Sequence, residues 1–282
     1  VVESGKTVEI DLNGHDIINT TSLPDTDPRY GNTTVFEVKG DATLNIKGDG
    51  DVKAIGTNLN EDGYRMAVYA YGDAQVNIYG GNFSNDQDYN NHQAQLDLIY
   101  ADQNAVINIY GGTFESKSAN DRGYWVLNLK DGSNAAINVY GGTFVNFDPS
   151  NSMTENPVKN FVVATSTTVK VSEDPQPNGS YEVVPEGGVV SVPIEVNDAE
   201  SLIEALSNPV VANIEVASSI DLSEKSAEEL TFEEYKTIDI KEGVTIRLGQ
   251  TNCLTAEKGL TLTGKGTIDN TSEDNSLSLI HI

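Results

Sequence analysis

A short phrase occurs four times in the first half of this chain, and no other feature limits its fold as strongly. The copies occupy residues 40–48, 72–80, 103–111 and 134–141, and each holds an asparagine (Asn45, Asn77, Asn108, Asn138). These asparagines recur at steps of 32, 31 and 30 residues. A strand-rich unit of this length cannot bury its own apolar face, so it must stack on its neighbours. The repeat therefore predicts a solenoid.

Within the second copy, residues 76–79 alternate apolar and polar side chains. Val76 and Ile78 share one face of the predicted strand, whereas Asn77 and Tyr79 share the other. The glycine pair at 80–81 then turns the chain, because glycine accepts backbone angles that other residues avoid. An aromatic residue follows the turn at a constant offset in three copies (Phe83, Phe114, Phe144), and Val52 takes its place in the first. We expect these side chains to form an internal column.

A second strand lies upstream in each copy, at residues 35–38, 67–71, 98–101 and 126–129, and a long polar stretch separates most copies. Two or three short strands, tight glycine corners and one long loop per repeat are typical of a parallel β-helix. A propeller would need four strands in about 40 residues and its own dipeptide signature. We therefore predict an all-β, right-handed parallel β-helix in which each strand pairs with its equivalent one coil away.

Further along the chain the repeat stops and then resumes. Residues 1–157 are expected to form the last coils of a first β-helix, and residues 158–193, with strands near 161–165, 168–172 and 180–185, a cap and linker. A short helix behind Asp198, with Leu202, Ile203 and Leu206 on one face, should open a second β-helix over 194–276. Its strands are expected at 213–216, 237–240, 244–248 and 260–263. The prediction is thus a tandem β-helix.

The last six residues, 277–282, fit no repeat. They resemble the translated end of a transposon adapter used in shotgun sequencing libraries. We therefore expect them to be a non-native tail and the chain to be an environmental fragment whose first residue, Val1, is a cut edge.

The charge balance disfavours two classes of partner. The chain has 17 lysines and arginines against 43 acidic residues, a formal net charge of −26. Nucleic acid and anionic membranes both require basic groups, so neither is an expected partner. No run reaches the roughly 18 apolar residues of a membrane span. A single cysteine and three scattered histidines predict neither a disulfide framework nor a zinc site.

Tyrosines recur at two outward positions of the predicted coils. One column holds Tyr79, Tyr110 and Tyr140, and the other holds Tyr69 and Tyr100. Such a strip offers aromatic surface for sugar rings while the hydroxyls stay hydrated. The alternative is that the tyrosines only stabilise the outer ladder by pairing across neighbouring strands. The outward asparagines are expected to form a hydrogen-bonded ladder.

The long loops should gather at one edge of the stack and carry recognition. They combine acids, amides, arginines and aromatic residues, which together would form a glycan-contacting rim. Arg122, Trp125 and Tyr89 are its candidate contacts, and Arg65 is expected on the same rim.

One of these loops also has part of a calcium-binding pattern. Asp86, Asp88 and Asn90 alternate, and Asp97 lies eleven residues after Asp86, which approaches the spacing of a calcium loop. Asn91 stands where that loop has glycine. We therefore expect no cofactor and keep calcium as the alternative for these four residues.

In coil rhythm, most of residues 1–276 resembles the pectin-lyase-like superfamily, so catalysis has to be considered. The resemblance implies the motifs Asn-x-Asp, Asp-Asp, Gly-His-Gly and Arg-x-Lys for its polygalacturonase-type hydrolases. The chain has no Asp-Asp, Gly-His-Gly or Arg-x-Lys, and residues 14–16 (Gly-His-Asp) come nearest. We predict no catalytic residues. The alternative is a polysaccharide lyase or glycoside hydrolase, for which Asp86 and Asp121 would be the candidate carboxylate pair.

The phrases at 109–114, 142–150 and 181–185 look similar to β-helix repeat proteins of gut bacteria and their phages. That resemblance implies a surface adhesin or a virion fibre or decoration protein located outside the cell. Its expected partner is a polysaccharide or cell-surface glycan. The sequence leaves the oligomeric state open, with a trimer as one option for a phage fibre. The sequence thus favours a non-enzymatic attachment module over an enzyme.

Overall fold

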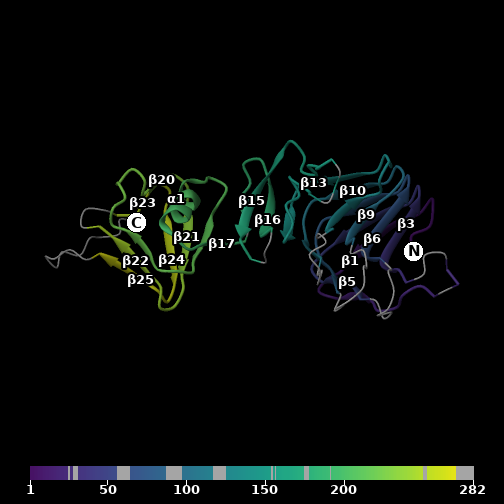
Figure 1. The fold of residues 1–282 in the computed structure, drawn as a ribbon, viewed down its shortest axis with the longest axis horizontal. Coiled ribbons are helices and arrows are strands. Elements are labelled where there is room, and N and C mark those ends of the chain that lie inside the picture. Colours follow the sequence, from purple (N-terminus) through teal and green to yellow (C-terminus); the bar gives the residue numbers. More distant parts are fainter. Residues whose placement is uncertain are drawn as a thin grey trace. The chain divides into compact units, whose positions relative to one another are not determined.

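A computed structural model describes residues 1–24, 26–27, 31–55, 64–86, 97–116, 125–153, 155, 157–174, 178–190, 192–249 and 253–270. The chain divides into two compact units, Val1–Glu186 and Gly187–Ile282. Figure 1 shows both units as stacks of strands.

The first unit consists of three sheets whose strands alternate along the chain. Sheet A contains β3 (Thr33–Gly40), β6 (Arg65–Gly72), β9 (Ile99–Ala101) and β12 (Leu127–Leu129). Sheet B contains β1 (Thr7–Asp11), β4 (Thr43–Lys47), β7 (Gln75–Ile78), β10 (Val106–Ile109) and β13 (Ala136–Val139). Sheet C contains β2 (Ile17–Asn19), β5 (Asp51–Ile55), β8 (Asn82–Asp86), β11 (Thr113–Ser116), β14 (Gly142–Val145), β15 (Ser166–Ser172) and β16 (Ser180–Pro185).

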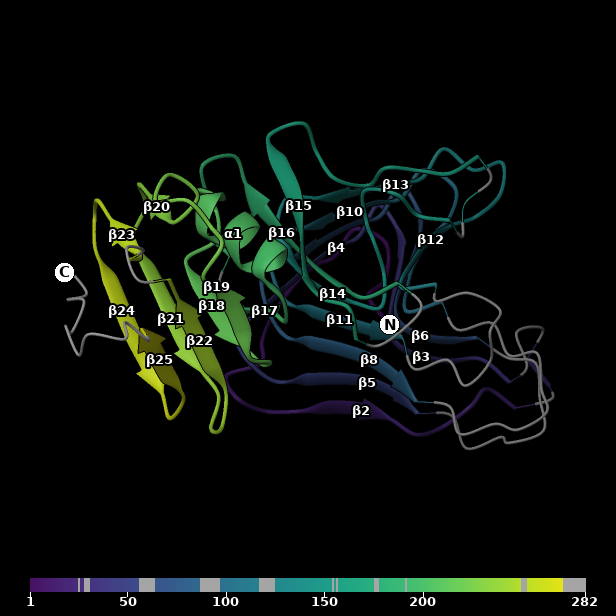
Figure 2. The same cartoon turned by 60° about the vertical axis from the view of Figure 1, so that its left-hand side comes forward.

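Strands one coil apart pair in parallel in all three sheets, which confirms the predicted parallel β-helix. In sheet B, Val76 lies opposite Leu44 on one side and Ile107 on the other, and all three are fully buried. Figure 2 shows the sheet C strands β2, β5, β8, β11 and β14 lying side by side in this order. The inward column of apolar residues is therefore the core of the unit.

The predicted phenylalanine column is confirmed. The rings of Phe83 and Phe114 stack with centroids 5.0 Å apart, and those of Phe114 and Phe144 with centroids 5.1 Å apart. Val52 is the register partner of Phe83, so it does take the place of the aromatic residue in the first coil. Parallel stacking of identical side chains follows from pairing without a register shift.

The predicted asparagine ladder is also confirmed, and it has a direction. Asn77 Nδ2 donates to Asn45 Oδ1 (2.9 Å), Asn108 Nδ2 to Asn77 Oδ1 (3.0 Å), and Asn138 Nδ2 to Asn108 Oδ1 (3.0 Å). Each amide group donates toward the preceding coil and accepts from the following one. Within the ladder, the Asn45 side chain therefore only accepts and the Asn138 side chain only donates.

Each glycine pair at the corner between sheets B and C serves two purposes. The second glycine has a positive φ, as at Gly112 (106°), which other residues rarely adopt. The first glycine lets adjacent coils approach each other, because a Cβ on Gly111 would lie 2.8 Å from the Tyr79 carbonyl oxygen. Side chains are thus excluded at both positions.

An antiparallel hairpin covers one edge of sheet C. β16 pairs antiparallel with β14, with Gly142 opposite Val183, and β15 pairs antiparallel with β16. Both expected strands at 168–172 and 180–185 are therefore present. The strand expected near 161–165 is not, because this segment makes only an isolated parallel bridge between Val139 and Val162.

The second unit begins with β17 (Ile194–Val196) and α1 (Ala199–Ser207). Asp198 caps the helix as predicted, since its carboxylate accepts the Ser201 backbone N–H, and Leu202 and Leu206 are buried. Ile203 is only partly buried, because the helix packs its Ala205 side instead.

All remaining strands of this unit pair in parallel. β17 is followed across its sheet by β18 (Asn213–Val216), β21 (Lys236–Ile240) and β24 (Leu260–Gly264). A second sheet contains β19 (Ile220–Leu222), β22 (Thr245–Leu248) and β25 (Thr267–Asn270), and a third β20 (Thr231–Phe232) and β23 (Thr255–Ala256). Within the described residues, no helix combines the length and apolar character that crossing a membrane requires.

A lysine replaces an apolar residue in the core of this second unit. Lys236 is fully buried, and its Nζ donates to the carbonyl oxygens of Ala205 (3.3 Å), Asn208 (2.7 Å) and Val211 (2.5 Å). Burial lowers the pKa of this ammonium group, and the charge of Glu234 opposes the shift. The lysine thereby ties the end of α1 to β21.

Candidate functional site

Three tyrosines form a column along the line where the strands of sheet B end. Tyr79, Tyr110 and Tyr140 each follow the last residue of a strand and precede the glycine corner. The ring centroids lie 4.9 Å apart for Tyr79 and Tyr110 and 4.7 Å apart for Tyr110 and Tyr140, with interplanar angles of 7° and 15°. Tyr79 is 51% exposed and Tyr110 43% exposed, so the column lies at the surface.

The stacking determines which part of each ring a ligand would meet. Nearly parallel rings whose centroids lie this close are stacked on one another. Each ring of the sheet B column therefore covers part of its neighbour's face.

A positive charge stands at one end of the sheet B column. Lys47 occupies the equivalent position one coil before Tyr79, and its Nζ lies 2.7 Å from Glu9 Oε1 and 3.9 Å from Asp11 Oδ2. The hydrogen bond to Glu9 raises the pKa of Lys47. The first coils therefore place an ion-paired group where the later ones place tyrosine.

Four tyrosines lie together on sheet A, three on its strands and one, Tyr64, directly before β6. Tyr69 and Tyr100 are register partners whose ring centroids lie 5.5 Å apart. Tyr71 stacks on Tyr69 at 4.9 Å, and Tyr64 stacks on Tyr100 at 5.9 Å. We call these four residues the sheet A cluster. The sequence predicted Tyr69 and Tyr100 but missed the other two, although the two-residue spacing from Tyr69 places Tyr71 on the same face.

Acidic groups surround the sheet A cluster. Tyr71 Oη donates to Glu37 Oε1 (3.0 Å), and Glu37 is itself the register partner of Tyr69. Burial raises the pKa of the Tyr100 phenol, and the nearby charges of Asp97 and Asp102 raise it further. The hydroxyl of Tyr100 therefore stays protonated at neutral pH and lies in a negative field.

Asp97 is a buried carboxyl group close enough to Tyr64 and Tyr100 to raise the pKa of both phenols. It is 2% exposed and accepts a hydrogen bond from Asn128 Nδ2 (2.9 Å). Burial raises the pKa of Asp97 to about 7, the bond from Asn128 opposes this shift, Glu155 adds to it and Lys130 opposes it. At neutral pH this carboxyl is therefore partly protonated, and its interactions are with neighbouring side chains rather than with solvent.

The calcium prediction is only partly covered by the structure. The carboxylate of Asp97 is engaged by Asn128, while the side chain of Asp86 and residues Asp88 and Asn90 lie outside the described residues. In the part of the chain that the structure describes, no group of three or more His, Cys, Asp or Glu residues could hold a metal ion. Calcium binding by the four residues stays a prediction.

The predicted loop rim is described at few of its positions. Tyr89, Arg122 and Asp121 lie outside the described residues, and Trp125 is half-buried beside β9, where its carbonyl oxygen accepts the Leu98 N–H (2.9 Å). Arg65, which we expected on this rim, is 1% exposed and its Nη1 donates to the Gly31 carbonyl oxygen (2.5 Å). That expectation is wrong, because the guanidinium group binds backbone carbonyls.

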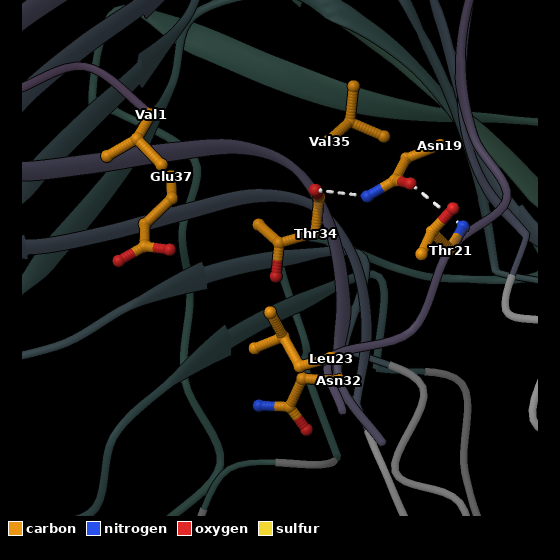
Figure 3. Close-up of a pocket in the computed structure, with 8 residues that line it drawn as sticks. All are labelled: Val1, Asn19, Thr21, Leu23, Asn32, Thr34, Val35 and Glu37. Atoms are coloured by element: carbon orange, nitrogen blue, oxygen red, sulfur yellow. Dashed lines mark hydrogen bonds between the residues drawn. The ribbon is translucent and has the colours of Figure 1, made fainter. Parts of the chain in front are cut away.

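A small hollow of about 140 Å³ lies beside the start of β3 (Figure 3). Asn19 connects two of the segments that line the hollow. Its Nδ2 donates to the Thr34 carbonyl oxygen (2.9 Å), and its Oδ1 accepts the Thr21 N–H (2.9 Å). The lining residues are Val1, Asn19, Thr21, Leu23, Asn32, Thr34, Val35 and Glu37. Among these described residues, Glu37 is the one with an ionisable side chain.

Comparison with known proteins finds no matching family model, no matching curated protein and no matching solved structure. The two groups of surface tyrosines are therefore the features from which a function has to be argued.

Proposed function

We propose that this chain is a non-enzymatic β-helix module, displayed outside the cell, that attaches to a polysaccharide or cell-surface glycan. The coils form its shaft and the surface tyrosines its contacts. The observation that carries the proposal is the presence of stacked tyrosines on the outward side of two of the three sheets. Sugar rings bind to such amphipathic groups because tyrosine combines apolar surface with a hydrogen-bonding hydroxyl.

The regular interior supports the shaft. Fully buried apolar residues, stacked phenylalanines and an asparagine ladder continue from coil to coil. Such a stack holds its outer residues at fixed positions before any ligand arrives, and less entropy is lost on binding to a pre-organised surface.

A polysaccharide lyase or glycoside hydrolase is the second candidate, and Asp97 is the observation that favours it. A carboxyl group with a pKa of about 7 suits a general acid at neutral pH. Its low exposure and its bond to Asn128 count against contact with a substrate. We therefore propose the attachment module ahead of the enzyme.

A glycan array combined with a reducing-sugar assay and an unsaturated-product assay tests both candidates. We expect binding without turnover, and we expect Tyr110→Ala and Tyr100→Ala each to weaken binding. Tyr235→Ala is the matched control, because Tyr235 is 50% exposed in the second unit and outside both tyrosine groups. Turnover that Asp97→Asn abolishes would replace the proposal with the enzyme.

Display on a bacterial surface or on a virion belongs to the same proposal. A phage fibre would be a trimer, whereas a surface adhesin has no such requirement. Light scattering on the purified protein measures the mass, and a trimer would favour the virion over the bacterial surface.

A further inference from the structure

We propose that the sheet A cluster binds a glycan carrying protonated amino groups, such as an oligomer of 2-amino-2-deoxy sugars, and that the sheet B column has no such preference. This inference rests on the proposed function and names the class of glycan.

Four tyrosines lie together in one patch of the surface. Tyr69 contacts both Tyr71 (4.9 Å) and Tyr100 (5.5 Å), and Tyr100 also contacts Tyr64 (5.9 Å). All four side chains are partly exposed. The stacked rings cover part of one another's faces, so the patch offers a sugar apolar ring surface and phenol hydroxyl groups. The attraction for an ammonium group comes from the carboxylates beside the rings.

Acidic side chains lie beside this patch. Glu37 lies beside Tyr69 in register, and Asp102, which directly follows β9, lies close enough to Tyr100 for its charge to raise the pKa of the phenol. Burial is the largest cause of that raised pKa, and the charges of Asp97 and Asp102 add to it, as do the neighbouring phenols of Tyr64 and Tyr69. Carboxylates next to aromatic rings complement a cation better than a neutral or anionic sugar.

Two lysines border the sheet A cluster and have to be weighed. Lys39 on β3 is the register partner of Tyr71, and its Nζ forms an ion pair with Glu3 (2.9 Å). Lys130 directly follows β12 and acts on Asp97, whose pKa it lowers. These cations are local exceptions in a chain of net charge −26, so the field that an approaching ligand meets attracts positive charge.

The sheet B column provides the internal contrast. The pKa of Tyr110 is raised by burial and then by Tyr140 and Tyr79, with no carboxylate involved. The column continues into Lys47, which is a cation. Aromatic rings are therefore common to both faces. Tyr69 and Tyr71 have the Glu37 carboxylate beside them, whereas the carboxylates near the sheet B column, Glu9 and Asp11, are paired with Lys47.

Calorimetric titration of the whole chain with three oligosaccharides of equal length tests the inference. The probes are a glucosamine oligomer, its N-acetylated form and a uronic acid oligomer. We expect the glucosamine oligomer to bind about tenfold more tightly than the N-acetylated form at low salt, since two exposed charge pairs supply this much. Added salt should reduce the difference.

A double substitution separates charge from aromatic contact. Glu37→Gln with Asp102→Asn removes both charges while retaining an acceptor for Tyr71 and for the Gln103 N–H. It should weaken binding of the glucosamine oligomer about tenfold and leave the N-acetylated oligomer unchanged. Glu224→Gln with Glu228→Gln is the matched control, because it removes the same charge from exposed positions in the second unit.

Each outcome decides between the inference and the proposed function. Equal affinity for the amino and N-acetylated oligomers would overturn the inference and leave the proposed function standing. The same holds if the control substitution has the effect of the double substitution. If no oligosaccharide binds on these probes or on the glycan array, both are wrong. A lysine peptide of equal charge that binds as tightly as the glucosamine oligomer would identify a cationic peptide site instead.

Discussion

Aspartate in place of asparagine at the two ends of the sheet B ladder should have different consequences. Asn138 only donates within the ladder, so Asn138→Asp removes its hydrogen bond to Asn108 Oδ1 (3.0 Å) and places two oxygens opposite each other. Asn45 only accepts within the ladder, so Asn45→Asp keeps the bond from Asn77 Nδ2 (2.9 Å) and gives it a charged acceptor. The same chemical change thus tests the direction of the ladder.

The magnitudes follow from the bonds involved. Loss of a part-buried hydrogen bond with an acceptor left unpaired costs about 1–2 kcal/mol for Asn138→Asp. For Asn45→Asp, the stronger bond to a carboxylate is offset by repulsion from Glu9, which lies opposite Asn45 but is exposed and paired with Lys47. We expect a net change within about 0.5 kcal/mol there.

Thermal unfolding of the two variants at neutral pH measures this difference. In a unit of this size, 1 kcal/mol shifts Tm by about 2–4 °C. Acid adds a second readout for Asn138→Asp, because the introduced carboxyl group, once protonated, can donate to Asn108 again. The folded form then favours the proton, so the cost should be absent below the unfolded pKa of about 3.9 and appear as the pH rises. Equal losses in the two variants at neutral pH would refute the directional ladder.

Three further substitutions test the core, the buried lysine and the buried acid. Phe114→Ala should lower the free energy of unfolding by about 3–5 kcal/mol in urea, and Phe114→Leu by less than half of that, because the central ring loses two stacked partners. Lys236→Met should destabilise the second unit by about 2–3 kcal/mol in the same assay, since three buried carbonyls lose their donor. Burial raises the pKa of Asp97 to about 7, so its contribution to stability is full below the unfolded pKa of about 3.9 and is lost as the pH rises through 7. Calorimetry between pH 4 and 8 should therefore show a steeper fall of Tm in the wild type than in Asp97→Asn, and parallel profiles would contradict the raised pKa.

The repeated part of the fold was predictable because its signals are periodic. Alternation placed Val76 inside and Asn77 outside, and the constant step between copies placed Phe83 over Phe114. Val52, which stands in the first coil where the later coils have phenylalanine, could also be aligned with Phe83. Because every coil repeats the same register, the alternation of side chains within one copy also predicts which residues meet between neighbouring coils.

The features that break the period were not predictable in the same way. Lys236 shares its face with Ile238 and Ile240, so its inward direction was visible, but the carbonyls that receive it come from a helix end and the loop after it. Asp97 lies just before its strand, where alternation gives no direction. Its burial depends on how the surrounding residues pack, which the spacing of residues in the sequence does not predict.

The unbroken register of the first unit has a consequence for how such a chain changes length over generations. A duplication of the gene segment that encodes one coil would insert another strand into each sheet, with a phenylalanine, an asparagine and a tyrosine already in phase. The shaft would grow by about 4.8 Å without any compensating mutation. Recombination between the copies at Gly80-Gly81 and Gly111-Gly112 would therefore change the length of the shaft from one generation to the next. The residues that contact a ligand would stay the same.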